Sequence, residues 1–329
     1  MAHNPNNTEA FIEAQQYSNF ILANLHDGLL PSTFSRDVAD FGSGTTLSVK
    51  TVGTATLQEV TGEVPMTYNA IDTGTITLNL TDYVGDAWSI DDVLRMDGSQ
   101  IDQLHSMRGM ESTRALQEYF ETRAFSVLDA AQNKAGDLNI INDRPHRWVA
   151  GGDGGTTRTM TLSDIVGLKL SFDKANVPQA GRILIVDPIV EATLNELLTY
   201  SSMVNNNPMF EGIVNTGFAR DHKFIKNIMG FDIYTSNRLP TLTATEALNA
   251  ASKGLADDIA EVGDVVNMAM CIGSDQTKPL MRAWRMNPNV ETRRNFELKR
   301  DEYDVRARFG LGAQRVDTLA TIITSATTY

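Results

Sequence analysis

The chain has 329 residues, of which 42% are hydrophobic and 21% are charged, and its formal net charge is −13 at pH 7. This balance is typical of a globular protein and too apolar for a disordered one. The negative charge argues against a surface that binds nucleic acid by neutralising its phosphates. The sequence has no apolar run of about eighteen residues and no basic start followed by an apolar core, so we expect neither a membrane span nor export.

The N-terminal part of the sequence divides into an arm and a hairpin. Residues 1–43 mix short apolar patches with turn formers, which favours an arm that lies over another surface. Leu47 and Val49 alternate with polar residues, as do Ile76 and Leu78, so the sequence predicts two strands here. The polar excursion between these strands is long for a loop and is therefore either functional or disordered.

Helical spacing of apolar residues begins after Ser99 and continues to Ala135, with Gly136 as a natural stop. The pattern predicts a helix of roughly thirty-five residues, about 50 Å long at 1.5 Å per residue. Such a helix is about three times the usual length. We therefore expect an elongated molecule in which the helix offers a long surface to another element.

Residues 160–285 have the pattern of a compact mixed α/β domain. Thr161 followed by Asp164 predicts a capped helix, and Asp187 before Pro188 predicts the start of another. The apolar run 183–186 predicts a strand buried on both faces. Further strands are expected at 231–234 and 265–272. The single cysteine, Cys271, lies in the last of these, where we expect a core residue.

Residues 289–309 form the most informative stretch, because apolar and charged residues alternate on both sides of an expected turn at Arg300-Asp301. This period of two predicts a hairpin with one apolar and one charged face. Keeping the apolar faces together predicts Leu298 opposite Tyr303 and Phe296 opposite Val305. We expect the long helix to cover the apolar face and a neighbouring subunit to meet the charged one.

No catalytic, cofactor or metal residue is predicted, because the nucleophile-elbow, CxxC, P-loop and dinucleotide-binding patterns are all missing and the histidines do not cluster. We expect the protein not to be an enzyme. One alternative is an α/β enzyme with a site near Asp187, at the carboxyl end of strand 183–186. Residues 282–308 carry eight basic and five acidic side chains. Because the two signs are interleaved, we favour an interface with other subunits over contact with nucleic acid.

Taken in order, these parts resemble the major capsid proteins of tailed bacteriophages, which have the HK97-like fold. The resemblance covers nearly the whole chain and includes the runs PQAGRILIVDPIVEATLNELL, MGFDIYTSNRLP and ETRRNFELKRDEYDVRARFGLGAQRVDTLATI. It implies an α+β fold with an N-terminal arm (1–43), an E-loop hairpin (44–82), a peripheral domain with the spine helix (83–159), an axial domain (160–285) and return strands of the peripheral domain (286–329).

The resemblance implies a virion protein that assembles in the host cytoplasm, as pentamers and hexamers, into an icosahedral shell around double-stranded DNA. It implies no sequence-specific DNA binding and no membrane contact. The portal protein is an expected partner, and the resemblance leaves room for a decoration protein. Since no long segment precedes the arm, we expect a separate scaffolding protein. An encapsulin-type compartment shell, which has the same fold, is the closest alternative.

In part of this family an E-loop lysine is crosslinked to an asparagine of a neighbour. Here the lysine near the loop is Lys50, at its base, so we expect no autocatalytic crosslink. The charged residues that we expect at contacts between subunits are Lys50, Glu59, Glu63, Arg293, Lys299, Arg306 and Arg308.

Overall fold

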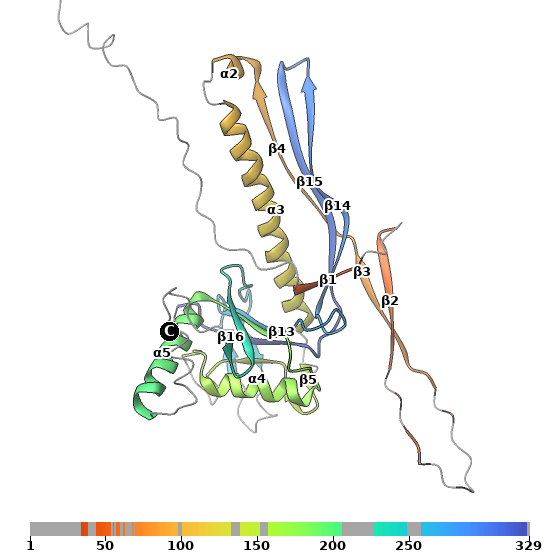
Figure 1. The fold of residues 1–329 in the computed structure, drawn as a ribbon, viewed down its shortest axis with the longest axis vertical. Helices are drawn as coiled ribbons and strands as arrows, with labels where there is room; N and C mark the ends of the chain where they lie inside the picture. The colour runs from red at the N-terminus through yellow and green to blue at the C-terminus, as the bar shows by residue number, and fades with distance from the viewer. Residues whose placement is uncertain are drawn as a thin grey trace, which may run out of the picture.

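A computed structural model describes residues 34–38, 44–53, 55, 57–59, 62, 68, 70–97, 101–132, 139–151, 157–205, 227–248 and 258–327. Most of the expected N-terminal arm and much of the polar excursion lie outside these residues. The described parts form a long limb, a compact domain at one end of the limb and a narrow hairpin that projects from the joint between them (Figure 1). The elongated shape predicted from the helical pattern is confirmed.

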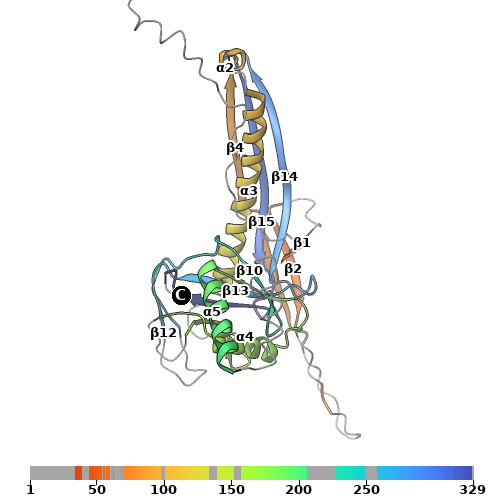
Figure 2. The same cartoon turned by 60° about the vertical axis from the view of Figure 1, so that its left-hand side comes forward.

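The limb consists of one sheet and one long helix. The sheet has the strand order β1-β14-β15-β4. Its strands are β1 (Ser35–Asp37), β4 (Asp82–Asp91), β14 (Leu280–Asn295) and β15 (Arg300–Ala313). Helix α3 (Ile101–Gln132) has 32 residues, or about 48 Å at 1.5 Å per residue, and lies along the sheet in both views (Figures 1 and 2). The short helix α2 (Asp92–Asp97) lies at the outer end of the limb.

Apolar and aromatic side chains join α3 to one face of the limb sheet. Leu116 on α3 packs with Val305 and Ala307 on β15. Closer to the joint, Phe120 stacks on Trp284 with 5.3 Å between ring centroids. Towards the outer end Asp86 on β4 accepts hydrogen bonds from Arg108 and Ser112, at 2.7 and 2.5 Å. The helix therefore covers the apolar face of the ribbon, as the alternation predicts.

The predicted register of the β14–β15 hairpin is wrong. In the structure Val290 lies opposite Val305 and Asn295 opposite Arg300, and the turn comprises residues 296–299. Asn295 sets this turn, because its side-chain oxygen accepts hydrogen bonds from the backbone N–H groups of Glu297 and Leu298, both at 3.1 Å. Phe296 and Leu298 consequently lie in the turn and are exposed instead of facing the helix.

Strand β4 is absent from the sequence-based prediction, although ten residues pair along β15 from Asp82 opposite Phe309 to Asp91 opposite Arg300. Its exposure alternates along the whole strand. The pattern is hidden because Asp86 occupies a position on the covered face, between Val84 and Trp88. An acidic residue is tolerated there because Arg108 and Ser112 bind its carboxylate.

The compact domain is built on a sheet of order β7-β16-β13-β8-β10-β9. Its strands are β7 (Arg147–Val149), β8 (Arg182–Val186), β9 (Asn227–Ile228), β10 (Phe231–Thr235), β13 (Val265–Cys271) and β16 (Leu319–Thr324). Its helices are α4 (Leu162–Lys174) and α5 (Pro188–Asn205). The short pairs are β5 (Ile140–Ile141) with β6 (Arg144–Pro145), and β11 (Glu246–Leu248) with β12 (Asp258–Ala260). Although we expected 286–329 to return to the limb, β16 pairs with β13 in this sheet.

Both faces of the compact sheet are covered. Ile183 and Ile185 of β8 pack in one core with Phe125 and Leu128 of α3, whereas Leu184 and Val186 pack in a second core with residues of α4 and α5. The prediction of a strand buried on both faces is confirmed, and so is the burial of Cys271. Because α3 contributes to the first core, the inner end of this helix joins the limb to the compact domain.

The two helix starts predicted in this domain are confirmed, because each depends on residues only a few positions apart. Thr161 and Asp164 form the predicted capping box of α4. Asp187 caps α5, since its carboxylate accepts a hydrogen bond from the backbone N–H of Ile189 at 3.1 Å. None of the helices in the described part of the chain carries an apolar stretch long enough for a bilayer crossing.

Candidate functional site

The outer face of the limb sheet, opposite α3, is a surface of interleaved charges. Strand alternation places Glu291 and Arg293 of β14 on this face with Asp304, Arg306 and Arg308 of β15. The residues between them, such as Val305 and Ala307, are buried against the helix. We call this surface the charged face of the limb. It is broad, polar and without a covering element in the described structure.

The side chain of Arg306 is already paired with residues of its own subunit. Its guanidinium pairs with Glu291 on β14 and with Asp304 at 2.7 Å, and it donates to the Tyr83 hydroxyl on β4 at 3.3 Å. The hydrogen bond to Tyr83 and the two carboxylates raise the pKa of Arg306 above its ordinary value. This side chain therefore ties three strands of one sheet together and is less available to a neighbour.

The other expected contact cations differ from Arg306. Arg293, Lys299 and Arg308 form no ion pair with any described acidic residue, and neither does Lys50. Arg293 and Lys299 are exposed, and Arg308 is half-buried. Arg293 nevertheless adds to the field that lowers the pKa of Glu302, after the hydrogen bonds from Asn295 and Arg300. Three positive side chains of the charged face and its turn thus have no acidic partner among the described residues.

The outer tip of the limb combines a fixed backbone with exposed apolar side chains. Arg294 donates to both carboxylate oxygens of Asp92 at 2.6 and 2.5 Å and to Asp301 at 3.0 Å. The hydrogen bond from Arg294 is the main cause that lowers the pKa of Asp92. The backbone N–H of Asp92 also donates to the carbonyl of Lys299 at 3.0 Å. Helix α2 is therefore clamped beside the turn of residues 296–299.

Five large apolar side chains are exposed on α2 and this turn. They are Val93, Leu94, Met96, Phe296 and Leu298. We call them the apolar tip. Exposed apolar residues that gather in one place mark surfaces that meet another protein. The sequence could have revealed the turn through Asn295, which favours Asx turns, but the wrong register concealed its exposure.

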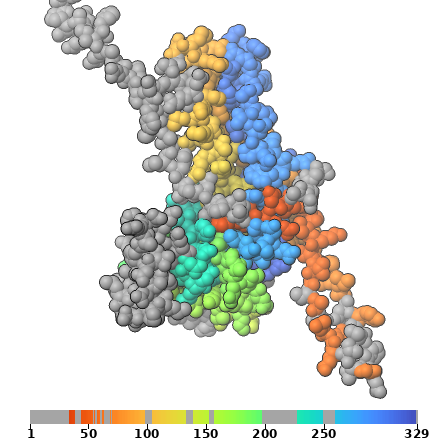
Figure 3. Space-filling model, viewed as in Figure 1, coloured from red at the N-terminus to blue at the C-terminus, as the bar shows by residue number. Residues whose placement is uncertain are grey.

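The projecting hairpin consists of β2 (Thr46–Val52) and β3 (Thr73–Asn79), which pair in antiparallel register with Leu47 opposite Leu78. Both predicted strands are confirmed. At its root, Leu78 packs with Met281 and Ala283 of β14. Further out it stands clear of the body (Figure 3), and Leu57 and Tyr68 are each 98% exposed.

The charged residues expected on this hairpin occupy different parts of it. Lys50 lies in β2 opposite Thr75, on the exposed side of the strand. Glu59 is exposed in the excursion beyond the strands. Glu63 lies outside the described residues. The hairpin therefore presents Lys50 on its paired strands and Glu59 in the excursion beyond them.

The chemistry expected of an enzyme is not assembled near Asp187. Its carboxylate caps α5, and its backbone N–H donates to the side-chain oxygen of Asn267 at 2.9 Å. In the described ranges no group of three His, Cys, Asp or Glu side chains is placed to hold a metal ion. What the described residues offer is a set of surfaces: the charged face, the apolar tip and the projecting hairpin.

Comparisons with known proteins identify a family and a fold for the chain. A family model described as phage capsid protein matches residues 72–323. A search of curated proteins finds no significant match. Among solved structures, the capsid of cyanophage P-SCSP1u matches with a TM-score of 0.71 at 15% identity, covering 97% of this chain and 94% of that one.

Two further capsids show the same likeness. The mature capsid of bacteriophage PhiM1 matches with a TM-score of 0.66 at 12% identity, over 97% of this chain and 93% of that one. The structure titled Mycobacterium phage Che8 matches with a TM-score of 0.63 at 14% identity, over 94% and 97%. At these identities the likeness establishes the fold, which is the HK97-like α+β fold of phage capsids with its long helix.

Proposed function

This chain belongs to the phage capsid protein family, and we propose that its copies assemble as pentamers and hexamers into the icosahedral shell of a tailed phage, around double-stranded DNA. As a capsid protein it is a structural component of the virion and not an enzyme. The enzyme alternative near Asp187 is thereby set aside.

The observation that carries the proposal is that, among the described residues, no element covers the charged face of the limb, the apolar tip or the outer part of the hairpin (Figures 1 and 3). An isolated two-stranded hairpin is marginal in water, and exposed apolar groups favour association. In a closed symmetric shell each such surface meets the same partner surface in every copy, so weak contacts are repeated many times.

Each part of the molecule is assigned one role in this proposal. The β2–β3 hairpin and its excursion, residues 44–82, act as the E-loop and lie on a neighbouring subunit. Helix α3 is the spine, within the peripheral domain of residues 83–159. Residues 160–285, which supply most of the compact domain, are the axial domain, which faces the centre of each pentamer or hexamer. Residues 286–329 supply the return strands, with β16 contributing to the axial sheet.

Charge complementarity supports a contact between the E-loop of one copy and the limb of the next. Glu59 and Glu63 on the loop are acidic, whereas Arg293 and Arg308 on the charged face have no described acidic partner. Lys299 at the tip and Lys50 on the paired strands of the hairpin extend this positive set. Arg306 supports the contact indirectly, because it holds the strands that present Arg293 and Arg308.

The apolar tip supports a second contact, between limbs of different subunits. Phe296 and Met96 are more than three-quarters exposed, and the Arg294 clamp holds the backbone that carries them. A rigid apolar end on each subunit suits a site where the limbs of several copies converge, because burial of that surface then favours each added copy.

The same proposal assigns the other partners. A separate scaffolding protein guides assembly, a portal protein occupies one vertex, and a decoration protein binds the outside where one is present. The net charge of −13 supports a wall that does not bind DNA tightly, because a shell that neutralised phosphates would retard the DNA as it enters.

The test is an E-loop replacement in the full-length protein, coexpressed with its scaffolding protein. Replacing residues 54–71 by Asn-Gly keeps Gly53 and Asp72 in their paired positions, where the Gly53 N–H donates to the Asp72 carbonyl at 2.8 Å. We expect the variant to fold and to stop forming polyhedral particles in electron micrographs, whereas the unaltered chain forms them. Normal particles from the variant would refute the role of the loop. Particles that enclose a protein cargo instead of DNA would favour the compartment-shell alternative.

A further inference from the structure

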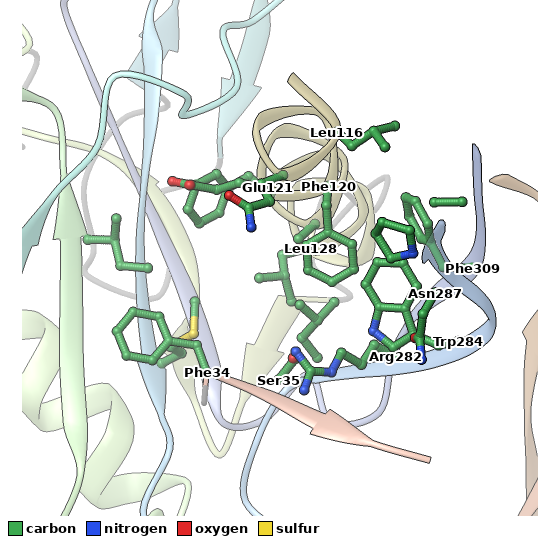
Figure 4. Close-up of a pocket in the computed structure, with 18 residues that line it drawn as sticks. Phe34, Ser35, Leu116, Phe120, Glu121, Leu128, Arg282, Trp284, Asn287 and Phe309 are labelled. Atoms are coloured by element: carbon green, nitrogen blue, oxygen red, sulfur yellow. The ribbon is translucent and has the colours of Figure 1, made fainter. Parts of the chain in front are cut away.

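A groove of about 460 Å³ lies at the joint between the limb and the compact domain (Figure 4). Phe120 and Leu128 of α3 line it together with Trp284 and Phe309 of the limb sheet, and Phe120 stacks on Trp284. Phe34, which precedes β1, lies at the opposite side. The walls are mainly apolar. The groove is separate from the charged face and from the apolar tip.

The groove exists because β14 departs from regular pairing beside it. The register with β15 shifts between Trp284 and Met286 and again between Met286 and Asn289. Pro288, in this interval, has no N–H to donate to a partner strand. Such irregularities bend a strand, and this stretch of β14 borders the groove. Asn287 and Pro288 are among the residues that line it.

Phe34, the first residue that the structure describes, lines this groove. Phe34 is preceded by 33 residues that lie outside the described structure, and its ring is fixed against Tyr234 in an edge-on contact with centroids 5.1 Å apart. The sequence just before it, Leu29-Leu30-Pro31, is apolar. Leu30 is four residues from Phe34, within roughly 14 Å of it even when the chain is fully extended at about 3.5 Å per residue.

We propose that the N-terminal segment of the same chain occupies this groove, with Leu29 and Leu30 filling the space between α3 and β14. A tethered segment that starts at the wall of an apolar groove binds at a high effective concentration. Its docking joins the limb to the compact domain and buries apolar surface that both parts leave open. The proposal concerns the single subunit and does not depend on shell formation.

A crosslinking experiment on the unassembled full-length chain tests the position of the segment. Leu30→Cys is combined with Gln117→Cys, which lines the groove on α3, or with Ala115→Cys, an exposed residue of α3 outside the groove lining. Cys271 is buried and does not compete. With a short thiol crosslinker we expect a link within one chain for the Gln117 pair and little for the Ala115 pair. Equal linking of both pairs, or of neither, overturns the proposal, and links between two chains overturn the assignment to the same chain.

A second variant tests the apolar contact without added cysteines. Leu29→Asp with Leu30→Asp should lower the melting temperature of the unassembled chain by several degrees and increase the binding of a hydrophobic dye, because the groove is left open. Leu57→Asp, at a position that is 98% exposed, serves as the control and should change neither. An unchanged melting temperature and dye signal in the double variant would contradict the docking. Particle formation is scored separately, so the shell role is judged on its own result.

Discussion

Arg294 of β14 and Asp92 at the start of α2 are joined by two hydrogen bonds, of 2.6 and 2.5 Å, although 202 positions separate them in the sequence. A two-bond pair between guanidinium and carboxylate fixes orientation as well as distance. The pair lies beside the exposed apolar side chains of the tip. Its main effect is therefore to hold the surface that we assign to contacts between limbs.

Arg294→Gln should loosen the tip without unfolding the subunit. Loss of the pair frees α2 from the turn at residues 296–299, so we expect faster hydrogen exchange in a peptide spanning residues 92–97, measured by mass spectrometry. Arg293→Gln is the matched control, because Arg293 has no described ion pair and lies on the other face of the strand. Equal exchange in both variants would show that the clamp does not order α2.

Phe296→Ser with Leu298→Ser should reduce shell formation and leave the subunit folded. Both side chains are more than half exposed, and surface substitutions usually change stability by no more than about 0.5 kcal/mol. The melting temperature of unassembled subunits and the yield of particles after sedimentation are the two measurements. Ile259→Ser with Val262→Ser, also exposed but on the compact domain, is the control and should give a higher yield of particles than the tip variant. Full particle yield from the tip variant would exclude the tip as a contact.

Arg293→Glu with Arg308→Glu should impair assembly more than folding. Each exposed ion pair is worth only about 0.2–1 kcal/mol, but the contact recurs in every subunit and the substitution replaces attraction by repulsion. We expect a higher protein concentration to be needed before particles appear in light scattering. Lys169→Glu with Lys174→Glu on α4 makes the same change in net charge and is the control. The contact assignment fails if both double variants assemble at the same concentration.

Gly310→Ala and Gly109→Ala should change stability in opposite directions. A side chain at Gly310 would meet the Asn79 carbonyl oxygen and, at 3.1 Å, the Leu80 Cα, both at the root of the projecting hairpin. Overpacking of this kind costs about 1–3 kcal/mol. At Gly109, within α3, the same side chain meets nothing within 4 Å, so alanine should stabilise the helix by about 1 kcal/mol. Denaturant unfolding of the two variants measures both effects, and a neutral Gly310→Ala would contradict the close approach.

His146 should make the subunit less stable in mild acid. It is fully buried, and burial lowers the pKa of its imidazole below the ordinary 6.5. As the pH falls, the unfolded chain therefore takes up a proton at a higher pH than the folded chain does. The free energy of unfolding is fully retained above pH 6.5, and it decreases as the pH falls towards the folded pKa.

The measurement for His146 is the melting temperature at several pH values between about 8 and 5. His146→Gln should flatten the decline below pH 6.5. Parallel curves for the unaltered chain and His146→Gln would show that another group controls the acid sensitivity.

The hairpin of β14 and β15 shows what the alternation of apolar and charged residues can and cannot predict. Its period of two correctly gives the strands and the faces, since Val305 and Ala307 are buried and Arg306 is not. It excludes only register slips by an odd number of residues, because an even slip leaves every side chain on its face. The expected and observed pairings differ by an even slip. The hydrogen bonds of Asn295 to the turn selected between them.

The sequence by itself determined the local features, because capping, burial on both faces and helical spacing depend on neighbours within a few positions. The Thr161–Asp164 cap, the strand at Ile183–Val186 and the long helix are of this kind. Only the tertiary structure decided which strands share a sheet, as for β16, and which charges are paired within the subunit, as for Arg306 and Arg294. Those outcomes depend on contacts between residues far apart in the chain, where many pairings satisfy the same local pattern.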